Sequence, residues 1–292
     1  MKHLLTVALV ATLAACSSAE EPKPEPKPEE EKVIKFPGGG RAYPKKKRIE
    51  IDGVAVYPTR APIELFACAT NGKEHEAVLS LQCVPQDVHF ALLIFGLKQQ
   101  SDFPDQKGPR GLGDPAKPVG DKVVIWIEWE IDSKKHRVRA EDLLTYGPPA
   151  AKRTMPRVGW TFAGSMVWER IDPDTNEKTG ETIYMANRER TLIATLHDPT
   201  SVLDNPLVSG GDDRMLHPNL DLLPPRGTRI IMAIEVPDEA ALKEMATIEA
   251  DADKEYTKNI EKEWKDIEET APDQKGAEPV PDNGGPKAGE DK

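Results

Sequence analysis

KVVIWIEWEI, residues 122–131, is the stretch that decides the fold class. Apolar and charged side chains alternate at its end, as in a strand with one buried and one solvent-facing side. The same reasoning predicts a strand in TLIATLHD (191–198) and a final one in RIIMAIEVP (229–237). A hairpin is predicted where GWTFAGSMVWERI (159–171) and ETIYMANRE (181–189) flank a polar turn.

Other segments add a second hairpin and short helices. PIELFACAT-NGK-EHEAVLSLQC (62–83) predicts a hairpin around Asn71-Gly72, since both residues tolerate positive φ. PQDVHFALLIFGL (85–97) begins with Pro and predicts a buried helix, and RAEDLLTYG (139–147) predicts a short one. We therefore expect an α+β fold: a single domain rich in antiparallel strands with a few short helices, spanning residues 49–237.

The C-terminal region predicts an amphipathic helix over residues 238–270. Apolar residues from Leu242 to Ile267 recur there at three- and four-residue steps. The single apolar stripe needs a partner: the chain's own domain, a second copy in a coiled coil, or a different envelope protein. Residues 271–292 are rich in Pro, Gly and charge and predict a disordered acidic tail.

The N-terminus is typical of an exported protein. A basic start precedes the apolar run LLTVALVATLAA, which as a helix would be about 18 Å long, too short to span a membrane of about 30 Å. LAACSS (13–18) is similar to the lipobox of bacterial lipoproteins. The resemblance implies removal of a signal peptide, residues 1–15, and lipidation of Cys16, which anchors the chain to the membrane.

The expected location is the bacterial cell envelope, facing the periplasm or the surface. Ser17, where lipoproteins retained at the inner membrane carry Asp, favours the outer membrane. Residues 16–48 form the lipid anchor and a disordered spacer rich in Pro, Glu and Lys. The net charge is −11, of which −9 lies between residues 238 and 292 (17 acidic, 8 basic), so the core is nearly balanced. This argues against nucleic-acid binding.

Two further cysteines, Cys68 and Cys83, are predicted to be buried free thiols. In the predicted hairpin Cys68 lies opposite His75, and Cys83 lies about 26 Å farther along the partner strand. This distance is too long for a disulfide.

Histidines beside carboxylates are the candidates for chemistry. His75 lies between two glutamates, and His197 precedes Asp198 in a segment that also holds Asp204 and Asp212. Such groups could supply a catalytic base or bind a divalent metal, with His75, His197 and Asp198 as catalytic candidates and Asp212 as an added ligand. The alternative is that His75 satisfies a hydrogen bond and that the aspartates shape turns. No known metal spacing is present, so we predict no cofactor, with a divalent metal as the alternative.

Several segments, in order, resemble the YdjY-type domain, a bacterial family without an assigned reaction. They are ELFACATNGKEHEAVL, DVHFALLIFGL, VVIWIEWE, WTFAGS, LIATLHDPTSVLDNPLVSGGDD and PPRGTRIIMAIEV, within about residues 50–236. The resemblance implies a single domain in an envelope setting. We expect a binding or scaffolding module at the membrane surface rather than an enzyme; the alternative is a metal-assisted envelope hydrolase.

Overall fold

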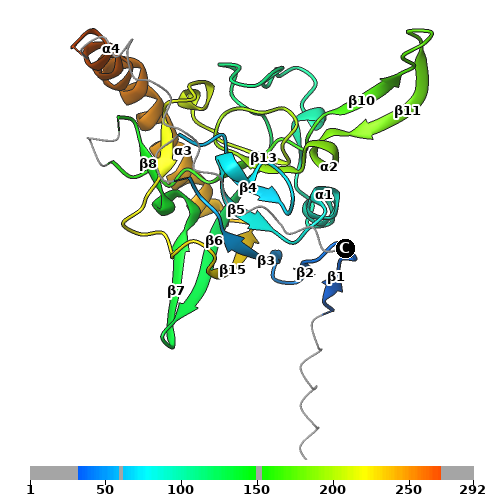
Figure 1. Cartoon of the computed structure of the whole chain (residues 1–292), viewed down its shortest axis with the longest axis horizontal. Coiled ribbons are helices and arrows are strands. Elements are labelled where there is room, and N and C mark those ends of the chain that lie inside the picture. The colour runs from blue at the N-terminus through cyan, green and yellow to red at the C-terminus, as the bar shows by residue number, and fades with distance from the viewer. Residues whose placement is uncertain (1–31, 59–61, 149–152, 271–292) are drawn as a thin grey trace, which may run out of the picture. The chain divides into compact units, whose positions relative to one another are not determined.

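The computed structural model describes residues 32–58, 62–148 and 153–270 (Figure 1). The predicted signal peptide, the Cys16 anchor, spacer residues 17–31 and the 271–292 tail lie outside the described residues. Within the described chain, no helix combines the length and apolar character needed to cross a bilayer.

Eight strands of the described chain form a closed ring. Six of the eight pairings are antiparallel, and two, β12–β13 and β4–β5, are parallel. The ring closes where β3 pairs with β5 through Gly53 and Leu81. In order around the ring the strands are β3 (Arg48–Ala55), β15 (Arg229–Glu235), β6 (Lys122–Ile131), β9 (Trp160–Phe162), β13 (Leu203–Asp204), β12 (Thr191–Ala194), β4 (Leu65–Ala69) and β5 (Ala77–Leu81).

The expectation of an α+β fold is therefore wrong. The body of the domain is a closed mixed β-barrel, and helices lie outside it (Figure 1). An eight-stranded barrel has an interior just wide enough for side chains to fill. Alternating residues of β3, β15 and β6 point inward, among them Ile51, Met232 and Ile125, each no more than 1% exposed. The burial pattern of these strands follows the alternation seen in the sequence.

The predicted hairpin around Asn71-Gly72 is also wrong. β4 and β5 pair in parallel, with Cys68 beside Ser80, and residues 70–76 carry the chain back to start the second strand. Both strands are buried along their whole length, and all their residues except Ser80 are apolar. Such sequences do not reveal strand direction. Cys68 and Cys83 are nevertheless free and buried, as predicted.

The remaining strands extend the barrel. The predicted 159–189 hairpin is present as β10 and β11, which form an exposed two-stranded arm (Figure 1). The 139–147 segment forms a 3-10 turn followed by a strand rather than the predicted helix. The strands outside the ring are β1 (Ile34–Lys35), β2 (Arg41–Tyr43), β7 (Lys134–Arg139), β8 (Leu144–Tyr146), β10 (Val167–Ile171), β11 (Lys178–Tyr184) and β14 (Leu216–Pro218).

Helix α1 (Pro85–Ile94) begins with proline at its first turn, where the missing N–H costs no hydrogen bond. Phe95 caps its C-terminus, and Gly96 follows with φ +84°. The prediction of a buried helix holds for one side only: Val88, His89 and Leu92 are buried, while other apolar side chains of the helix face solvent. Short helical segments occur at η1 (Glu74–Glu76), η2 (Gln100–Asp102), η3 (Ala140–Leu143), α2 (Met185–Glu189) and η5 (Val208–Gly211).

The C-terminal helix consists of α3 (Glu239–Glu255), a π-helical turn (Tyr256–Ile260) and α4 (Glu261–Thr270). Asp238 caps its start by accepting a hydrogen bond from Ala241 N. Met245, Ala252 and Ile260 are buried, so the apolar stripe packs on the chain's own domain. A partner or self-association through this helix stays a prediction.

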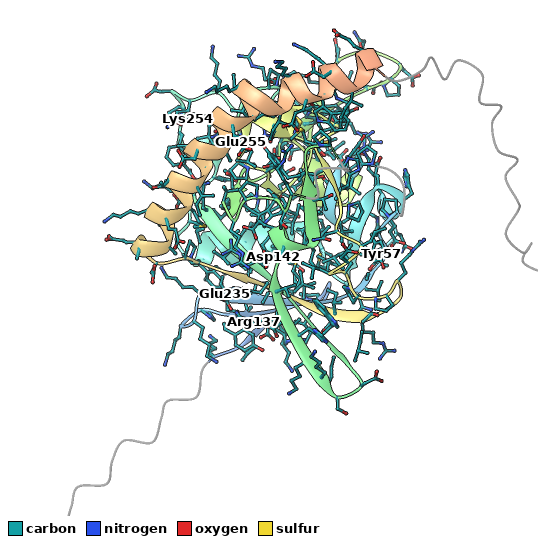
Figure 2. The ribbon with its side chains drawn as sticks, turned by 90° about the vertical axis from the view of Figure 1, so that its left-hand side faces the viewer. Tyr57, Arg137, Asp142, Glu235, Lys254 and Glu255 are labelled. Carbon is teal, nitrogen blue, oxygen red and sulfur yellow. The ribbon has the colours of Figure 1, made fainter. Side chains whose placement is uncertain are left out.

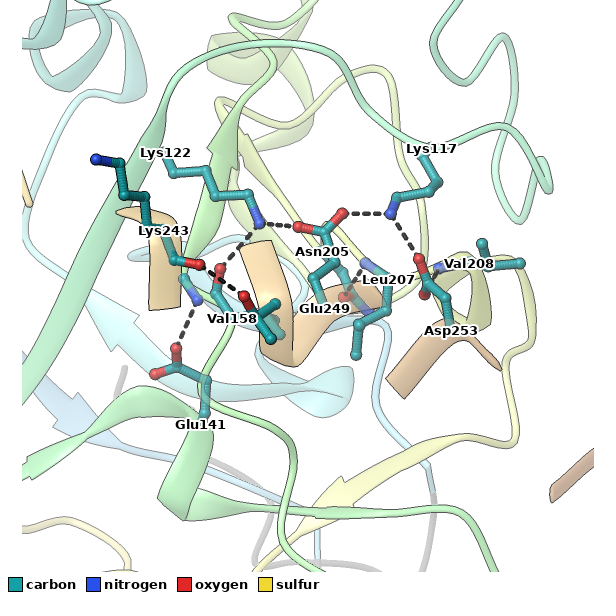
Figure 3. Close-up of polar contacts among 12 residues, drawn as sticks. Lys117, Lys122, Glu141, Val158, Asn205, Leu207, Val208, Lys243, Glu249 and Asp253 are labelled. Atoms are coloured by element: carbon teal, nitrogen blue, oxygen red, sulfur yellow. Dashed lines mark hydrogen bonds and ion pairs between the residues drawn. The ribbon is translucent and has the colours of Figure 1, made fainter. Parts of the chain in front are cut away.

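Ion pairs hold α3 against the barrel (Figure 3). The Glu249 carboxylate pairs with both Lys117 and Lys122, and Lys117 also contacts Asp253 at 2.6 Å. Asp253 further accepts a hydrogen bond from Val208 N at 2.9 Å. The network therefore joins the helix to the start of β6, to the loop before β6 that holds Lys117, and to η5.

A second ion network covers the outer side of the barrel. Arg48 on β3 pairs with Glu128 on β6 and with Glu235 on β15. Arg137 on β7 contacts the same two glutamates, at 3.0 and 2.9 Å, and Figure 2 shows Arg137 beside Glu235. These cross-strand pairs link four neighbouring strands.

Candidate ligand pocket

A pocket of about 530 Å³ lies between α1, the loop that follows it and the base of the β10–β11 arm. This volume is in the range of small-molecule sites. We call it the neutral pocket. It is lined by Gln86, His89, Phe90, Gln99, Gln100, Ser101, Phe103, Pro104, Gln106, Pro109, Ala163, Gly164, Ser165, Met166, Val167, Tyr184, Pro199 and Asp204.

A tight backbone turn at residues 164–165 shapes one wall of the pocket. Gly164 and Ser165 have φ of +88° and +62°, a conformation that glycine adopts readily and other residues rarely do. A side chain at position 164 would also collide with Gln99, since an added Cβ would lie 1.9 Å from Gln99 Oε1. Ser165 is held by its own hydroxyl, which donates to Thr200 O at 2.7 Å and accepts from Ala186 N at 3.0 Å.

His89 and Tyr184 form a hydrogen-bonded pair in this pocket. His89 Nδ1 lies 2.7 Å from the Tyr184 hydroxyl, which donates to Gly164 O at 3.2 Å. The phenol has a single proton, and with that proton in the bond to Gly164 O, Nδ1 carries the hydrogen of its own bond, as in the Nδ1–H tautomer of His89. Burial lowers the pKa of His89, against an opposing backbone hydrogen bond to Gly164. Burial likewise raises the pKa of Tyr184.

Asp204 brings a buried carboxyl group from β13. Its two oxygens accept hydrogen bonds from Asn205 N at 2.7 Å and from Asp198 N at 3.2 Å. Burial raises the pKa of Asp204 well above 3.8, and these two hydrogen bonds oppose the shift only in part. A carboxyl group in this position tends toward its neutral form, which can donate a hydrogen bond.

The pocket lining is poor in residues that carry a charge at neutral pH. Although 30% of the whole chain is Asp, Glu, Lys or Arg, none of the lining residues, all of which are described, is Glu, Lys or Arg. The three titratable groups that line it, His89, Tyr184 and Asp204, all have pKa values shifted toward the neutral form. Amides and hydroxyls remain to contact a ligand, beside aromatic and proline rings.

Ser165 and His89 are each bonded to other groups in this arrangement. Ser165 Oγ bonds to backbone atoms of Thr200 and Ala186, and His89 Nδ1 is engaged by Tyr184. A nucleophilic serine needs a base within hydrogen-bond reach, whereas the bonds of the Ser165 hydroxyl given above run to backbone atoms. The groups present can donate to or accept from a hydroxyl or amide ligand.

His197, predicted as a catalytic or metal-binding residue, is a fully buried structural ring. Its Nδ1 lies 2.7 Å from Asp114 O, and its Nε2 lies 3.0 Å from Asn205 O and 2.9 Å from Leu207 O. Burial lowers the pKa of His197, while the three carbonyl oxygens oppose the shift. The His197 ring thus links the loop that holds Asp114 to the segment that holds Asn205 and Leu207.

The other three predicted residues lie in separate places. Asp198 shapes a turn by accepting from Thr200 N and Oγ1 at 2.8 and 2.7 Å. Asp212 pairs with Arg214 at 2.9 Å. His75 lies on η1 with its side chain 81% exposed. In the part of the chain that the structure describes, no three His, Cys, Asp or Glu side chains are placed to hold a metal.

The pocket residues His89 and Tyr184 were not found from the sequence, and Asp204 was noted only as a neighbour of His197. His89 lies within an apolar helical run, where a histidine carries no motif. Tyr184 comes from a hairpin that lies 95 residues farther along the chain. A polar residue on the buried side of an otherwise apolar helix is the one signal that the sequence offered.

By its structure this domain is a closed mixed β-barrel with a pocket of ligand size at its side. A family model described as the YdjY domain matches residues 44–235, which hold all eight barrel strands and the whole pocket. The chain belongs to the YdjY domain family, as the sequence resemblance indicated. The C-terminal helix lies beyond the matched residues. No curated protein matches the chain, and no solved structure matches it.

Proposed function

We propose that this protein is a lipid-anchored binding module of the bacterial cell envelope, and that its YdjY domain takes an uncharged ligand in the neutral pocket. The observation that carries the proposal is the chemistry of the pocket lining. A charged ligand would lose its hydration there without meeting a formal opposite charge, which costs several kcal/mol. An uncharged ligand with hydroxyl or amide groups meets matching hydrogen-bond partners.

The anchor is tested by metabolic labelling of the full chain with an alkyne-bearing fatty acid in a bacterial host. Label is expected on the wild-type chain and absent from a Cys16→Ser variant. A wild-type chain without label would contradict the proposed lipid anchor. Something other than a lipid on Cys16 would then have to hold the chain in the envelope. Fractionation of the labelled chain tests the preference for the outer membrane that Ser17 indicates.

The ligand class is tested with sets of small molecules that share one framework and differ only in an amide, a carboxylate or an amine. We expect the amide members to raise the melting temperature and the charged members to leave it unchanged. Ser101→Trp places a bulky side chain at the exposed edge of the pocket and should abolish the shift, whereas Thr247→Trp on the exposed side of α3 should retain it. Equal binding of charged members, or binding that survives Ser101→Trp, would contradict the proposal.

A further inference from the structure

One ring nitrogen of His89 is open to the neutral pocket. His89 is only 8% exposed and lines the pocket, and its Nδ1 is bonded to the Tyr184 hydroxyl at 2.7 Å. In the described part of the chain, no hydrogen bond of normal length and angle reaches Nε2. The fully buried side-chain nitrogen and oxygen atoms without a partner in these residues are Arg153 Nε and Trp160 Nε1. His89 Nε2 is therefore reached by solvent, and the pocket is the open space beside it.

Aromatic rings fix how the imidazole of His89 is turned. It packs edge-to-face against Phe162 and Tyr184, with ring centroids 5.2 and 5.4 Å apart, and the centroid of Phe90 lies at 6.0 Å. A half-turn of the imidazole would move Nδ1 away from the Tyr184 hydroxyl and give up the 2.7 Å bond. Nδ1 thus stays on the side of Tyr184, and the pocket meets Nε2.

Nε2 of His89 is a hydrogen-bond acceptor. With the Tyr184 proton in the bond to Gly164 O, Nδ1 carries the ring hydrogen, and Nε2 keeps a lone pair. The Ser165 hydroxyl, the Tyr184 hydroxyl and both carboxyl oxygens of Asp204 are already bonded within the protein. The glutamine amides of the lining carry donors as well as acceptors, so they suit either kind of ligand group. His89 Nε2 is the acceptor that can tell one kind from the other.

We propose that His89 Nε2 selects, among uncharged ligands, those that donate an N–H or O–H group to it, such as amides and alcohols. The proposal rests on the uncharged ligand class of the proposed function and narrows it. A ketone, an ester or a tertiary amide of the same shape offers only acceptors and would cover Nε2 without bonding to it. A covered acceptor without a partner loses its bond to water, which weakens binding by about tenfold or more.

Pairs of aryl amides and aryl methyl ketones test this preference, with benzamide and acetophenone as the first pair. The two members have nearly the same size and both present a carbonyl oxygen, but only the amide has N–H groups. In titrations of the full chain we expect the ketones to bind about tenfold or more weakly than the amides. His89→Phe keeps an aromatic ring but removes Nε2, so the two members should then bind about equally. His136→Phe is the matched control, because His136 stacks on Trp129 of β6 outside the pocket, and it should keep the wild-type preference.

A measurement on the wild-type chain covers the case in which His89→Phe does not fold. The ¹⁵N resonance of His89 Nε2 responds when its lone pair accepts a hydrogen bond. Benzamide should move this resonance, acetophenone should move it far less, and Nδ1 should keep its proton with both. A purely structural role of His89 would give the same response to the two compounds.

The outcomes separate this proposal from the proposed function. Equal binding of amides and ketones by the wild-type chain, or an Nε2 resonance that a bound amide leaves unmoved, would overturn the role of His89 and leave the uncharged ligand class standing. A free chain that carries the His89 proton on Nε2 would overturn the role without any ligand. If no amide or ketone binds while matched carboxylates or amines do, or if no pair binds at all, both the role of His89 and the uncharged ligand class are overturned.

Discussion

Glu249 is the point at which the C-terminal helix can be loosened by a single substitution. Its carboxylate pairs with Lys117 and Lys122, and the side chains of Glu249 and Lys122 are only 16% and 17% exposed. Exposed pairs contribute about 0–1 kcal/mol, and breaking a fully buried one costs about 3–5 kcal/mol. Because this network is mostly but not fully buried, we expect Glu249→Gln to lower the free energy of unfolding by about 1–3 kcal/mol.

The assay is urea unfolding followed by tryptophan fluorescence. Glu263→Gln is the matched control, because Glu263 lies on the same C-terminal helix and pairs with Arg153 at 2.8 Å. Both of these side chains are more exposed than those of Glu249 and Lys122. Glu263→Gln should therefore lower the free energy of unfolding by less than about 0.5 kcal/mol. A double-mutant cycle of Glu249→Gln with Lys122→Met should give a coupling energy of about 1 kcal/mol or more. Equal costs for the two glutamates, or a coupling energy near zero, would refute the reasoning.

Two further predictions concern the pocket and the barrel. Since burial raises the pKa of Asp204 above its unfolded value of 3.8, its contribution to stability is fully present below pH 3.8 and is lost as pH rises through the folded pKa. Asp204→Asn should therefore gain in melting temperature relative to wild type as the pH rises above 3.8, and a difference independent of pH would contradict a raised Asp204 pKa. Gly53→Ala should lower the free energy of unfolding in urea by about 1–3 kcal/mol, because an added Cβ would lie 2.6 Å from both Leu81 Cδ2 and Ser80 O. Gly53 lies where β3 pairs with β5 to close the barrel, so an unchanged unfolding midpoint would argue against that closure.

The strands were largely predictable from the sequence, but their pairing was not. Alternation in KVVIWIEWEI and the β-branched residues of RIIMAIEVP identify β6 and β15 without any knowledge of the fold. β4 and β5 are buried on both sides, and an apolar run carries no mark of strand direction, so Asn71-Gly72 suggested a hairpin that the chain does not form. Closure depends on the pairing of β3 with β5, and local sequence patterns do not specify such a contact.

The same limit applies to the candidate site. His197 and Asp198 stand out in the sequence because a histidine adjoins a carboxylate. His197 nevertheless bonds to backbone oxygens, and Asp198 bonds to Thr200 within its own turn. The neutral pocket is assembled from α1, the arm and β13, which the chain brings together only in the closed barrel. Its lining carries no motif, because its chemistry depends on burial rather than on residue spacing.

The protonation state of His89 decides whether the pocket is uncharged, as the proposed ligand class requires. The proposed ligand class depends on a pocket without formal charge, and His89 is its basic side chain. Nitrogen-detected NMR of the imidazole rings across a pH series reports the tautomer and the titration of each ring. We expect His89 to keep its proton on Nδ1, bonded to Tyr184, and to titrate below pH 6.5. A His89 ring that titrates at or above pH 6.5 would place a cation in the pocket near neutral pH and would contradict the claim.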